Sequence, residues 1–388
     1  MEHSKTFGFS GAGIWGRCSG SVLLAVDEPE LPDTPDSLEG DAAHWVGEQM
    51  LKKFKEQTPD VYQYGESLIG QSDPKGTIIT EDMFDAAWVY VEDITKVVGD
   101  DVDNLHVELR VHSGHIDPEA WGTSDAFYYD ASTNTLHVWD FKYGHSSVLA
   151  EDNFQLVGYA FSFCEMNQLI QSNPRLSLNI VQPRCFDGNG AVRNWVTSID
   201  QVRAHINIMK GSVAQYRGNN SRFVTGDHCR HCQSSYRCAA ITKVATMCID
   251  ISMEGMVSNP TNESLAYQKQ LIDTSIERLK SKQQSIDIQL TERIKRGEPV
   301  QGYRMDTTYS NRNWTCDADT AFMIGDVMKV DLRTKTKPIT PTQAMAAFKK
   351  KGIDESVILN YSAKSKTGLK LTADDGSEAR RIFSKGKL

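Results

Sequence analysis

The sequence has no run of apolar residues long enough to cross a membrane, so we expect no transmembrane helix. Its first residues lack the basic stretch followed by an apolar stretch that marks a secretory signal peptide. We therefore expect a reducing, cytoplasmic location in which the eight cysteines do not form disulfides. A positive net charge is also missing, and at −9 the chain is not expected to coat nucleic acid by charge alone. Internal repeats and long low-complexity segments are absent as well.

The chain is long enough, at 388 residues with 39 % apolar content, for two or three domains with real cores. Short apolar runs alternate with helical patterns in the first 250 residues, which predicts an α/β fold with a central mixed sheet and helices on its faces. We expect three parts: residues 1–250, a long helical arm at 251–300, and a small α/β domain at 301–388. The clearest predicted elements are strands at 107–111 and 176–182 and helices at 200–216, 262–296 and 342–351.

Two aspartates fifteen residues apart are the main chemical feature of the sequence. Asp125 ends Gly122-Thr123-Ser124-Asp125, and Asp140 and Lys142 lie in a strand-like stretch at 138–142. Alternate side chains of a strand share a face, so Asp140 and Lys142 point the same way. Residues 131–134 form a turn, which predicts a hairpin that places Asp125 beside Asp140. Paired carboxylates hold hard divalent cations, although an Asp-x-Lys strand alone is more often a solvated face, and the hairpin makes the two interpretations about equal.

Two helices are expected to add polar side chains to this pair. His44 and Glu48 are four residues apart, on one face of a helix that precedes the strands. A histidine in such a place is more often structural than a ligand. Gln155 and Tyr159 show the same spacing just after the Lys142 strand, where they would offer an amide and a phenol towards water or phosphate. The alternative is an ordinary amphipathic helix.

Three cysteines with short spacing indicate a second metal site. Cys229, Cys232 and Cys238 form a C-x2-C-x5-C run, which is typical of metal ligation. A fourth ligand is needed, and His228, His231 or a distant cysteine such as Cys18 could supply it. Four thiolates suit a zinc ion or a 4Fe–4S cluster equally well by ligand softness.

Taken in order, these motifs resemble the RecB-like nucleases of the PD-(D/E)XK superfamily, over roughly residues 14–240. They are most similar to the iron–sulfur branch, which includes AddB-type nuclease domains and CRISPR-adaptation nucleases. The whole chain also resembles an uncharacterised family of phage and prophage proteins, including the stretch from Gly302 to Trp314. That resemblance implies a bacterial host cytosol. Many nuclease relatives have Ile or Val where this chain has Ser124, and proline where it has Ser19.

The resemblance implies a role for each motif residue. Cys18, Cys229, Cys232 and Cys238 would hold a 4Fe–4S cluster that staples the two ends of the nuclease domain. The active-site ions, Mg²⁺ or Mn²⁺, would be bound by His44, Asp125, Asp140 and the carbonyl of Phe141. Lys142 would be the catalytic lysine, and Gln155 and Tyr159 would complete the site. The implied reaction is metal-assisted hydrolysis of a phosphodiester bond.

Three functions follow as alternatives. The first is a DNA exonuclease that processes single- or double-stranded ends in phage recombination or replication, alone or with a single-strand-annealing or single-strand-binding protein. The second is a non-catalytic DNA-binding or scaffolding protein with the same fold. The third is the nuclease with zinc in place of the cluster. An oligomer is possible in each case.

The C-terminal part differs in charge from the rest of the chain. Residues 328–388 contain 14 Lys or Arg and 6 Asp or Glu, so the basic residues gather at this end. They could contact DNA or form an exposed, solvated face.

The long helix predicted at 262–296 carries aliphatic residues at an interval of seven. Leu265, Ile272, Leu279 and Ile286 make this row, with Ile276 and Leu290 between its members. Such a row predicts either a coiled-coil arm or a helix that lies on the core.

Overall fold

The computed structural model describes residues 4–26, 28, 32–185, 190–253, 261–309, 313–333, 340–354, 356–363 and 366–373. Part of the predicted basic C-terminal end, including Lys364 and residues 374–388, lies outside these ranges, as do residues 310–312 of the family-like stretch. The chain separates into two compact units, Met1–Ser285 and Ile286–Leu388, and the boundary falls inside a helix. The three-part division at residues 250 and 300 stays a prediction.

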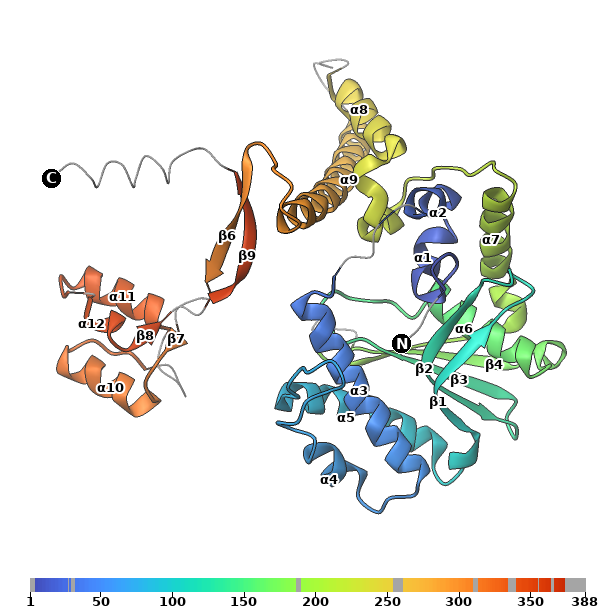
Figure 1. Cartoon of the computed structure of the whole chain (residues 1–388), viewed down its shortest axis with the longest axis horizontal. Coiled ribbons are helices and arrows are strands. Elements are labelled where there is room, and N and C mark those ends of the chain that lie inside the picture. Colours follow the sequence, from blue (N-terminus) through green and yellow to red (C-terminus); the bar gives the residue numbers. More distant parts are fainter. Residues whose placement is uncertain are drawn as a thin grey trace. The chain divides into compact units, whose positions relative to one another are not determined.

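A five-stranded mixed sheet forms the centre of the first unit (Figure 1). Its strands lie in the order of the sequence: β1 (Leu105–His112), β2 (Trp121–Asp130), β3 (Thr135–Phe141), β4 (Arg175–Val181) and β5 (Val192–Ser198). All neighbours are antiparallel except β3 and β4, which run parallel and are joined through helix α6 (Phe154–Met166). The predicted strands at 107–111 and 176–182 correspond to β1 and β4. The predicted α/β class, with a mixed sheet flanked by helices, is confirmed.

Each face of the sheet has its own apolar core, because helices cover both sides. On one face, Trp139 and Phe141 of β3 pack with residues of α3 (Pro35–Lys55) and α5 (Glu81–Val98), next to the short α4 (Val61–Glu66). On the other, Leu136 and Val138 of the same strand pack with α6, α7 (Ile199–Arg217) and the N-terminal segment. Strand β3 is therefore buried on both sides, and all but one of its seven residues are buried.

The helices around the sheet begin at residues that cap them well. Thr34 and Ser37 form a capping box at the start of α3, and Pro35 occupies the first turn. The Thr80 hydroxyl accepts a hydrogen bond at the start of α5, and the Asn153 side chain does the same at α6. These caps determine where α3 and α6 start. They therefore also determine where His44 and Gln155 lie along their helices relative to the sheet.

The N-terminal helices return to a segment about two hundred residues later in the sequence. This part comprises α1 (Ala12–Trp15), α2 (Ser19–Ala25), η4 (Asp227–His231), η5 (Gln233–Arg237) and α8 (Ala239–Met253). The Gly20 amide donates to Arg222 O at 2.9 Å, and the Ser19 hydroxyl donates to Gln215 at 2.7 Å. The predicted helices at 200–216 and 262–296 correspond to α7 and α9 (Asn262–Lys295).

Helix α9 contacts the segment at residues 227–238 through a polar face. The Ser281 hydroxyl donates to Cys229 O at 2.5 Å, and the Ser285 hydroxyl donates to Gln233 O at 2.5 Å. The aliphatic row of α9 does not face this contact, since Leu265 is 50 % exposed and Ile272 is 46 % exposed. For these residues the prediction of a helix packed on the core by its aliphatic row is therefore wrong.

The second unit has a small core of its own, formed by Leu332, Ala344, Phe348, Ile358 and neighbouring apolar residues. Its described elements are β6 (Tyr303–Tyr309), β7 (Asn313–Trp314), α10 (Ala318–Val327), α11 (Pro341–Lys350), α12 (Ser356–Leu359), β8 (Ser362–Ala363) and β9 (Lys366–Ala373). Strands β6 and β9 pair antiparallel, as do β7 and β8. The predicted helix at 342–351 corresponds to α11.

Among the described residues, no helix combines the length and the apolar character needed to span a bilayer.

Candidate functional site

The β2–β3 hairpin brings the two predicted aspartates together. Its register pairs Ala126 with Trp139, so Asp125 and Asp140 lie opposite each other on adjacent strands. Both carboxylates are buried, at 4 % and 3 % exposure. Asp125 Oδ2 accepts a 2.6 Å hydrogen bond from the backbone N–H of Phe141, which closes the hairpin next to Asp140. The turn at residues 131–134, with Asn134 at a φ of 50°, makes this pairing possible.

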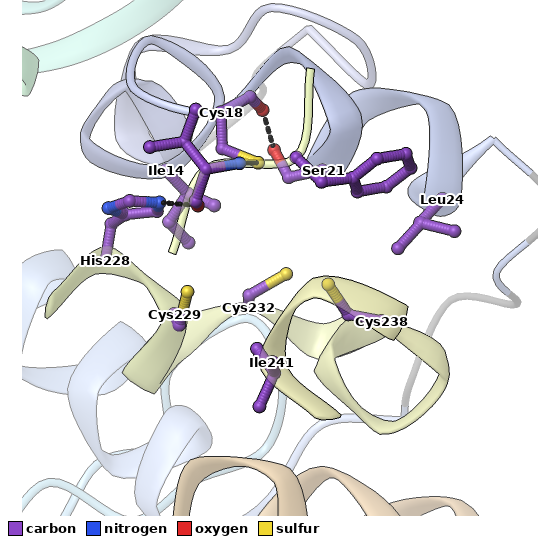
Figure 2. Close-up of a pocket in the computed structure, with 11 residues that line it drawn as sticks. Ile14, Cys18, Ser21, Leu24, His228, Cys229, Cys232, Cys238 and Ile241 are labelled. Carbon is purple, nitrogen blue, oxygen red and sulfur yellow. Dashed lines mark hydrogen bonds between the residues drawn. The ribbon is translucent and has the colours of Figure 1, made fainter. Parts of the chain in front are cut away.

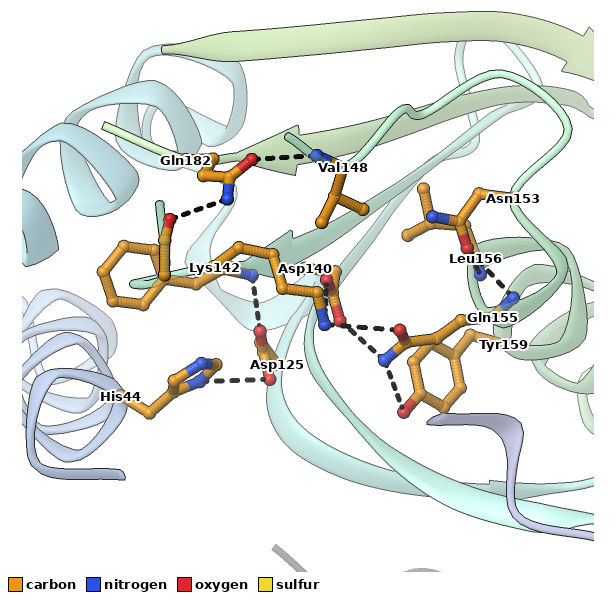
Figure 3. A network of polar contacts seen from close by, with 12 residues as sticks. His44, Asp125, Asp140, Lys142, Val148, Asn153, Gln155, Leu156, Tyr159 and Gln182 are labelled. Atoms are coloured by element: carbon orange, nitrogen blue, oxygen red, sulfur yellow. Dashed lines mark hydrogen bonds and ion pairs between the residues drawn. The ribbon is translucent and has the colours of Figure 1, made fainter. Parts of the chain in front are cut away.

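Lys142 completes an ion pair just after the end of β3. Its Nζ lies 2.8 Å from Asp140 Oδ2 and donates to Gln155 Oε1 at 3.3 Å (Figure 3). The Lys142 amide bonds to Val181 O at 2.8 Å, so the parallel strand β4 holds its backbone in place. The lysine side chain keeps 28 % of its surface exposed, whereas its aspartate partner is closed off. The pair therefore presents an ammonium group at the border between the core and solvent.

His44 reaches the hairpin from α3. Its Nδ1 lies 3.6 Å from Asp125 Oδ1, and its ring packs against Phe141 at 5.1 Å between ring centroids. The Phe141 side chain is buried and stacks on Tyr90. Alanines 42 and 43 on the same helix are fully buried, and their small side chains allow α3 to approach the sheet closely.

Gln155 and Tyr159 complete the site from α6. Gln155 Nε2 donates to Asp140 Oδ1 at 2.8 Å and to the Tyr159 hydroxyl at 3.3 Å. The amide thus bridges the carboxylate and the lysine, as expected for a residue that orients both. Tyr159 is only 1 % exposed and packs edge-on against Phe9, so its phenol cannot reach water or phosphate as the sequence suggested. From its position behind Gln155, the Tyr159 hydroxyl can hold the side-chain amide of Gln155 in one orientation.

The charges of these groups shift one another's pKa values. Burial raises the pKa of Asp140 and outweighs the opposite effect of Lys142. Burial opposes ionisation of Asp125, yet His44 and the Phe141 N–H together hold the pKa of that carboxyl below its usual value. Burial would lower the pKa values of His44 and Lys142, but the neighbouring carboxylates raise both. At neutral pH Lys142 is therefore a cation, not a base.

Strand β1 contributes a carboxylate that the motif analysis missed. The register pairs Val107 with Ala126 and Leu109 with Ser124, which puts Glu108 across from Asp125. Glu108 has a φ of 53°, a costly conformation for this residue that is typical of functional sites. Burial, followed by repulsion from Asp125 and Glu48, raises its pKa to about 8. The only acidic residue in the predicted strand at 107–111 was the available signal.

An open pocket adjoins Glu108 and His44 on the α3 side. It has a volume of about 180 Å³ and is also lined by Asp41, Trp45, Glu48, Asp73, Pro74 and Lys75. The Lys75 ammonium bonds to Asp33 at 2.8 Å and to Asp41 at 2.7 Å. The carboxylates give the pocket a negative character, which suits a cation better than a phosphate.

Gln182 was also missed, although it ends a predicted strand. Its side-chain amide donates to Gly144 O at 2.7 Å and to Ser146 O at 2.8 Å. Its oxygen accepts from the Val148 amide at 3.1 Å (Figure 3) and from Arg193 Nη1 at 2.7 Å. One buried glutamine thus anchors the loop that joins Lys142 to the helix of Gln155. Only the tertiary register reveals this role.

The four predicted cluster cysteines line one small, mostly apolar cavity (Figure 2). Cys18 comes from the start of α2, and Cys229, Cys232 and Cys238 come from η4, η5 and the residues that border them. Backbone amides point at two of the sulfurs: Val224 N lies 3.4 Å from Cys18 Sγ and Gly226 N lies 3.4 Å from Cys229 Sγ. Burial raises the pKa of the Cys232 thiol to about 11.

The two histidines near this cavity differ in position. His228 lines it, but its Nε2 contacts Val224 O at 2.9 Å, whereas His231 is exposed and is not among the lining residues. Across the described part of the chain, no group of three or more His, Cys, Asp or Glu side chains is arranged to hold a metal ion. At the acidic site, Lys142, Gln155 and the Phe141 amide already contact the carboxylates.

Comparison with known proteins identifies a family for the chain but no activity. A family model described as protein of unknown function (DUF2800) matches residues 3–376, which is nearly the whole chain. No curated protein matches the sequence.

Proposed function

The chain belongs to the DUF2800 family, and we propose that it is a metal-dependent nuclease that hydrolyses phosphodiester bonds of DNA. The observation that carries this proposal is the meeting of His44, Asp125, Asp140 and Lys142 in one network around two buried carboxylates, with Gln155 behind them. These residues come from α3, β2, β3 and α6, in the order that the resemblance to RecB-like nucleases implies. A solvated Asp-x-Lys face would not be buried or connected in this way.

The residues of the acidic pair fit a hard divalent cation. Asp140 Oδ2 is buried, and within the described residues no group donates a well-directed hydrogen bond to it, although Lys142 Nζ lies 2.8 Å away. Asp125, Asp140, His44 and the Phe141 carbonyl would hold Mg²⁺ or Mn²⁺. When bound, the ion would lower the pKa of a water molecule and stabilise charge on the phosphate.

The chain's own side chains act around that position. Lys142 is a fixed cation, so it neutralises charge that develops on the scissile phosphate. Gln155 holds Asp140 Oδ1, which leaves Oδ2 turned towards the lysine. Tyr159 keeps its proton, because burial and then the charge of Asp140 raise its pKa well above the usual value, and it positions Gln155.

The cysteine cavity fits a 4Fe–4S cluster by its donors. Four thiols line the cavity, the histidine that also lines it has its Nε2 on Val224 O, and two backbone N–H groups point at sulfurs. Such a cluster would tie α2 to the segment at residues 229–238 and support the fold. Zinc is the second candidate, since soft thiolates bind it equally well. Anaerobically purified protein with visible absorbance supports the cluster, and colourless protein with one zinc supports the alternative.

The biological role that we propose is the processing of DNA ends during phage recombination or replication. The test is degradation of end-labelled linear DNA, single- and double-stranded, with Mg²⁺ or Mn²⁺. Wild type is compared with Lys142→Ala and with the control Lys96→Ala, which changes an exposed lysine of α5. We expect metal-dependent cleavage by wild type and the control, and its loss in Lys142→Ala.

The other outcomes are equally informative. Equal cleavage by all three proteins would point to a contaminant and remove Lys142 from the mechanism. DNA binding without cleavage, by folded wild type that is also supplied with a single-strand-annealing protein, would favour the DNA-binding or scaffolding function. Circular dichroism of each variant separates loss of activity from loss of fold.

A further inference from the structure

Helix α9 carries a row of aliphatic side chains on its surface. Leu265 is 50 % exposed, Ile272 46 %, Ile276 42 % and Leu279 44 %. The face that packs on the cysteine segment lies roughly 120° around the helix. That buried face is polar: Ser275, Arg278, Ser281 and Ser285. The aliphatic row is thus separate from the contact that attaches α9 to the segment at residues 227–238, and an exposed apolar row of this kind marks an interaction site.

The spacing of this row defines the kind of partner. Leu265, Ile272, Leu279 and Ile286 recur at seven residues, and Ile276 and Leu290 each follow a member by four. This is the a/d pattern of a coiled coil, in which each side chain enters a hole between residues of a second helix. The pattern spans most of a helix of 34 residues, or roughly 50 Å. The partner is therefore a helix of matching length and period.

We propose that the partner is α9 of a second copy of this chain, paired antiparallel. In a parallel pair Lys269 would face its own copy inside the seam, where two ammonium groups repel. An antiparallel pair instead puts Ile276 next to Leu279 of the second copy, and Leu265 next to Leu290 of that copy. A two-fold axis between the helices makes the two halves of the contact identical, as in most homodimers.

The charges along the seam agree with this direction. Asp273 and Lys280 border the aliphatic row on the side away from the buried polar face, and both are exposed. In the antiparallel pair Asp273 of each copy lies beside Lys280 of the other, which gives two attractive contacts. Among the described residues, Asp273 pairs with Lys269 and Lys280 pairs with Glu277, both within the same helix. These exposed pairs exchange partners at little cost.

The experiment is sedimentation velocity of the full chain over a range of concentrations. Wild type is expected to form a reversible dimer, and Leu279→Lys is expected to raise the dissociation constant at least tenfold. Gln284→Lys, an exposed change on the same helix outside the seam, is the control and should leave the dimer intact. Wild type that is monomeric at every concentration, or a dimer that Leu279→Lys leaves unchanged, would overturn the proposal.

A charge swap tests the direction without changing the apolar seam. Asp273→Lys and Lys280→Asp should each weaken the dimer several-fold, because each creates like-charge pairs across the interface. The double variant should restore wild-type affinity, since it recreates both contacts with the signs exchanged. In a parallel dimer these residues do not meet. If the single variants weaken the dimer and the double variant does not restore its affinity, the antiparallel pairing is ruled out. Nuclease activity plays no part in either readout.

Discussion

Replacing Gln182 by alanine should loosen the loop that joins Lys142 to the helix of Gln155. Gln182 is 1 % exposed and makes four hydrogen bonds, two to carbonyls of the loop, one to the Val148 amide and one to Arg193. Alanine removes all four. Because the loop is largely exposed, its carbonyls can bond to water instead, whereas Arg193 is buried and would lose a charged hydrogen bond.

The magnitude follows from these partners. Each of the three bonds to the loop contributes about 0.5–1 kcal/mol, because water replaces the lost partner. The bond to buried Arg193 contributes about 2 kcal/mol, because that donor is charged. Gln182→Ala should therefore reduce the free energy of unfolding by roughly 3.5–5 kcal/mol. Gln182→Glu keeps the acceptor for Arg193 and Val148 but loses both donors, so its cost should be smaller, about 1–2 kcal/mol.

Hydrogen exchange measured by mass spectrometry provides the assay. Peptides that cover residues 143–150 should exchange at least tenfold faster in Gln182→Ala than in wild type, with Gln182→Glu between them. Gln270→Ala, an exposed glutamine of α9, is the control and should match wild type. Urea denaturation gives the global change. Unchanged exchange in the loop, together with an unchanged urea midpoint, would refute the role assigned to Gln182.

Three further predictions concern stability. The pKa of Glu108 is raised to about 8 from 4.5, so the folded protein binds a proton that the unfolded chain releases, and stability should fall as pH rises through this window. Melting temperatures measured with a chelator present should fall with pH in wild type and change less in Glu108→Gln. At pH 8.5 the free energies of unfolding of the two proteins should differ by on the order of 1–2 kcal/mol. Lys142→Ala leaves the buried carboxylate of Asp140 without its cation. This should lower the free energy of unfolding by about 3 kcal/mol near pH 7 and by less near pH 4, as urea titrations at both pH values would show. Gly158→Ala would bring a Cβ to 2.5 Å from the buried Phe9 ring and should destabilise by about 1–3 kcal/mol, whereas Gly40→Ala on open α3 should stabilise slightly in the same urea assay.

Local sequence patterns were sufficient to predict the hairpin and the residues on it. Alternation in the stretch around Asp140, with a polar turn before it, determined both the strand pair and the direction of the acidic side chain. The helix of Gln155 was predicted from the spacing of Gln155 and Tyr159, and in the structure Asn153 caps its start. These are interactions between residues close in sequence, so the sequence alone contains the information needed to predict them.

Residues that act through tertiary register were not predictable in this way. Glu108 becomes part of the site only because β1 pairs with β2 at one register. Gln182 acts across the parallel pairing of β3 and β4, which no local pattern determines. The exposure of Tyr159 was also misjudged, because the N-terminal segment that covers it lies about 150 residues earlier. For α9, periodicity identified the aliphatic row but not which face the unit would bury.

The pairing of Gly20 with Arg222 has a consequence for synthesis of the chain. The first helices leave the ribosome long before the segment that completes their packing, which lies about two hundred residues later. At translation rates of roughly 5–20 residues per second, this interval is about 10–40 s. During it, apolar side chains near the start of the chain have no native partner. The N-terminal helices are therefore among the last parts of the first unit to acquire native packing, and a chaperone that binds nascent chains would find its target there.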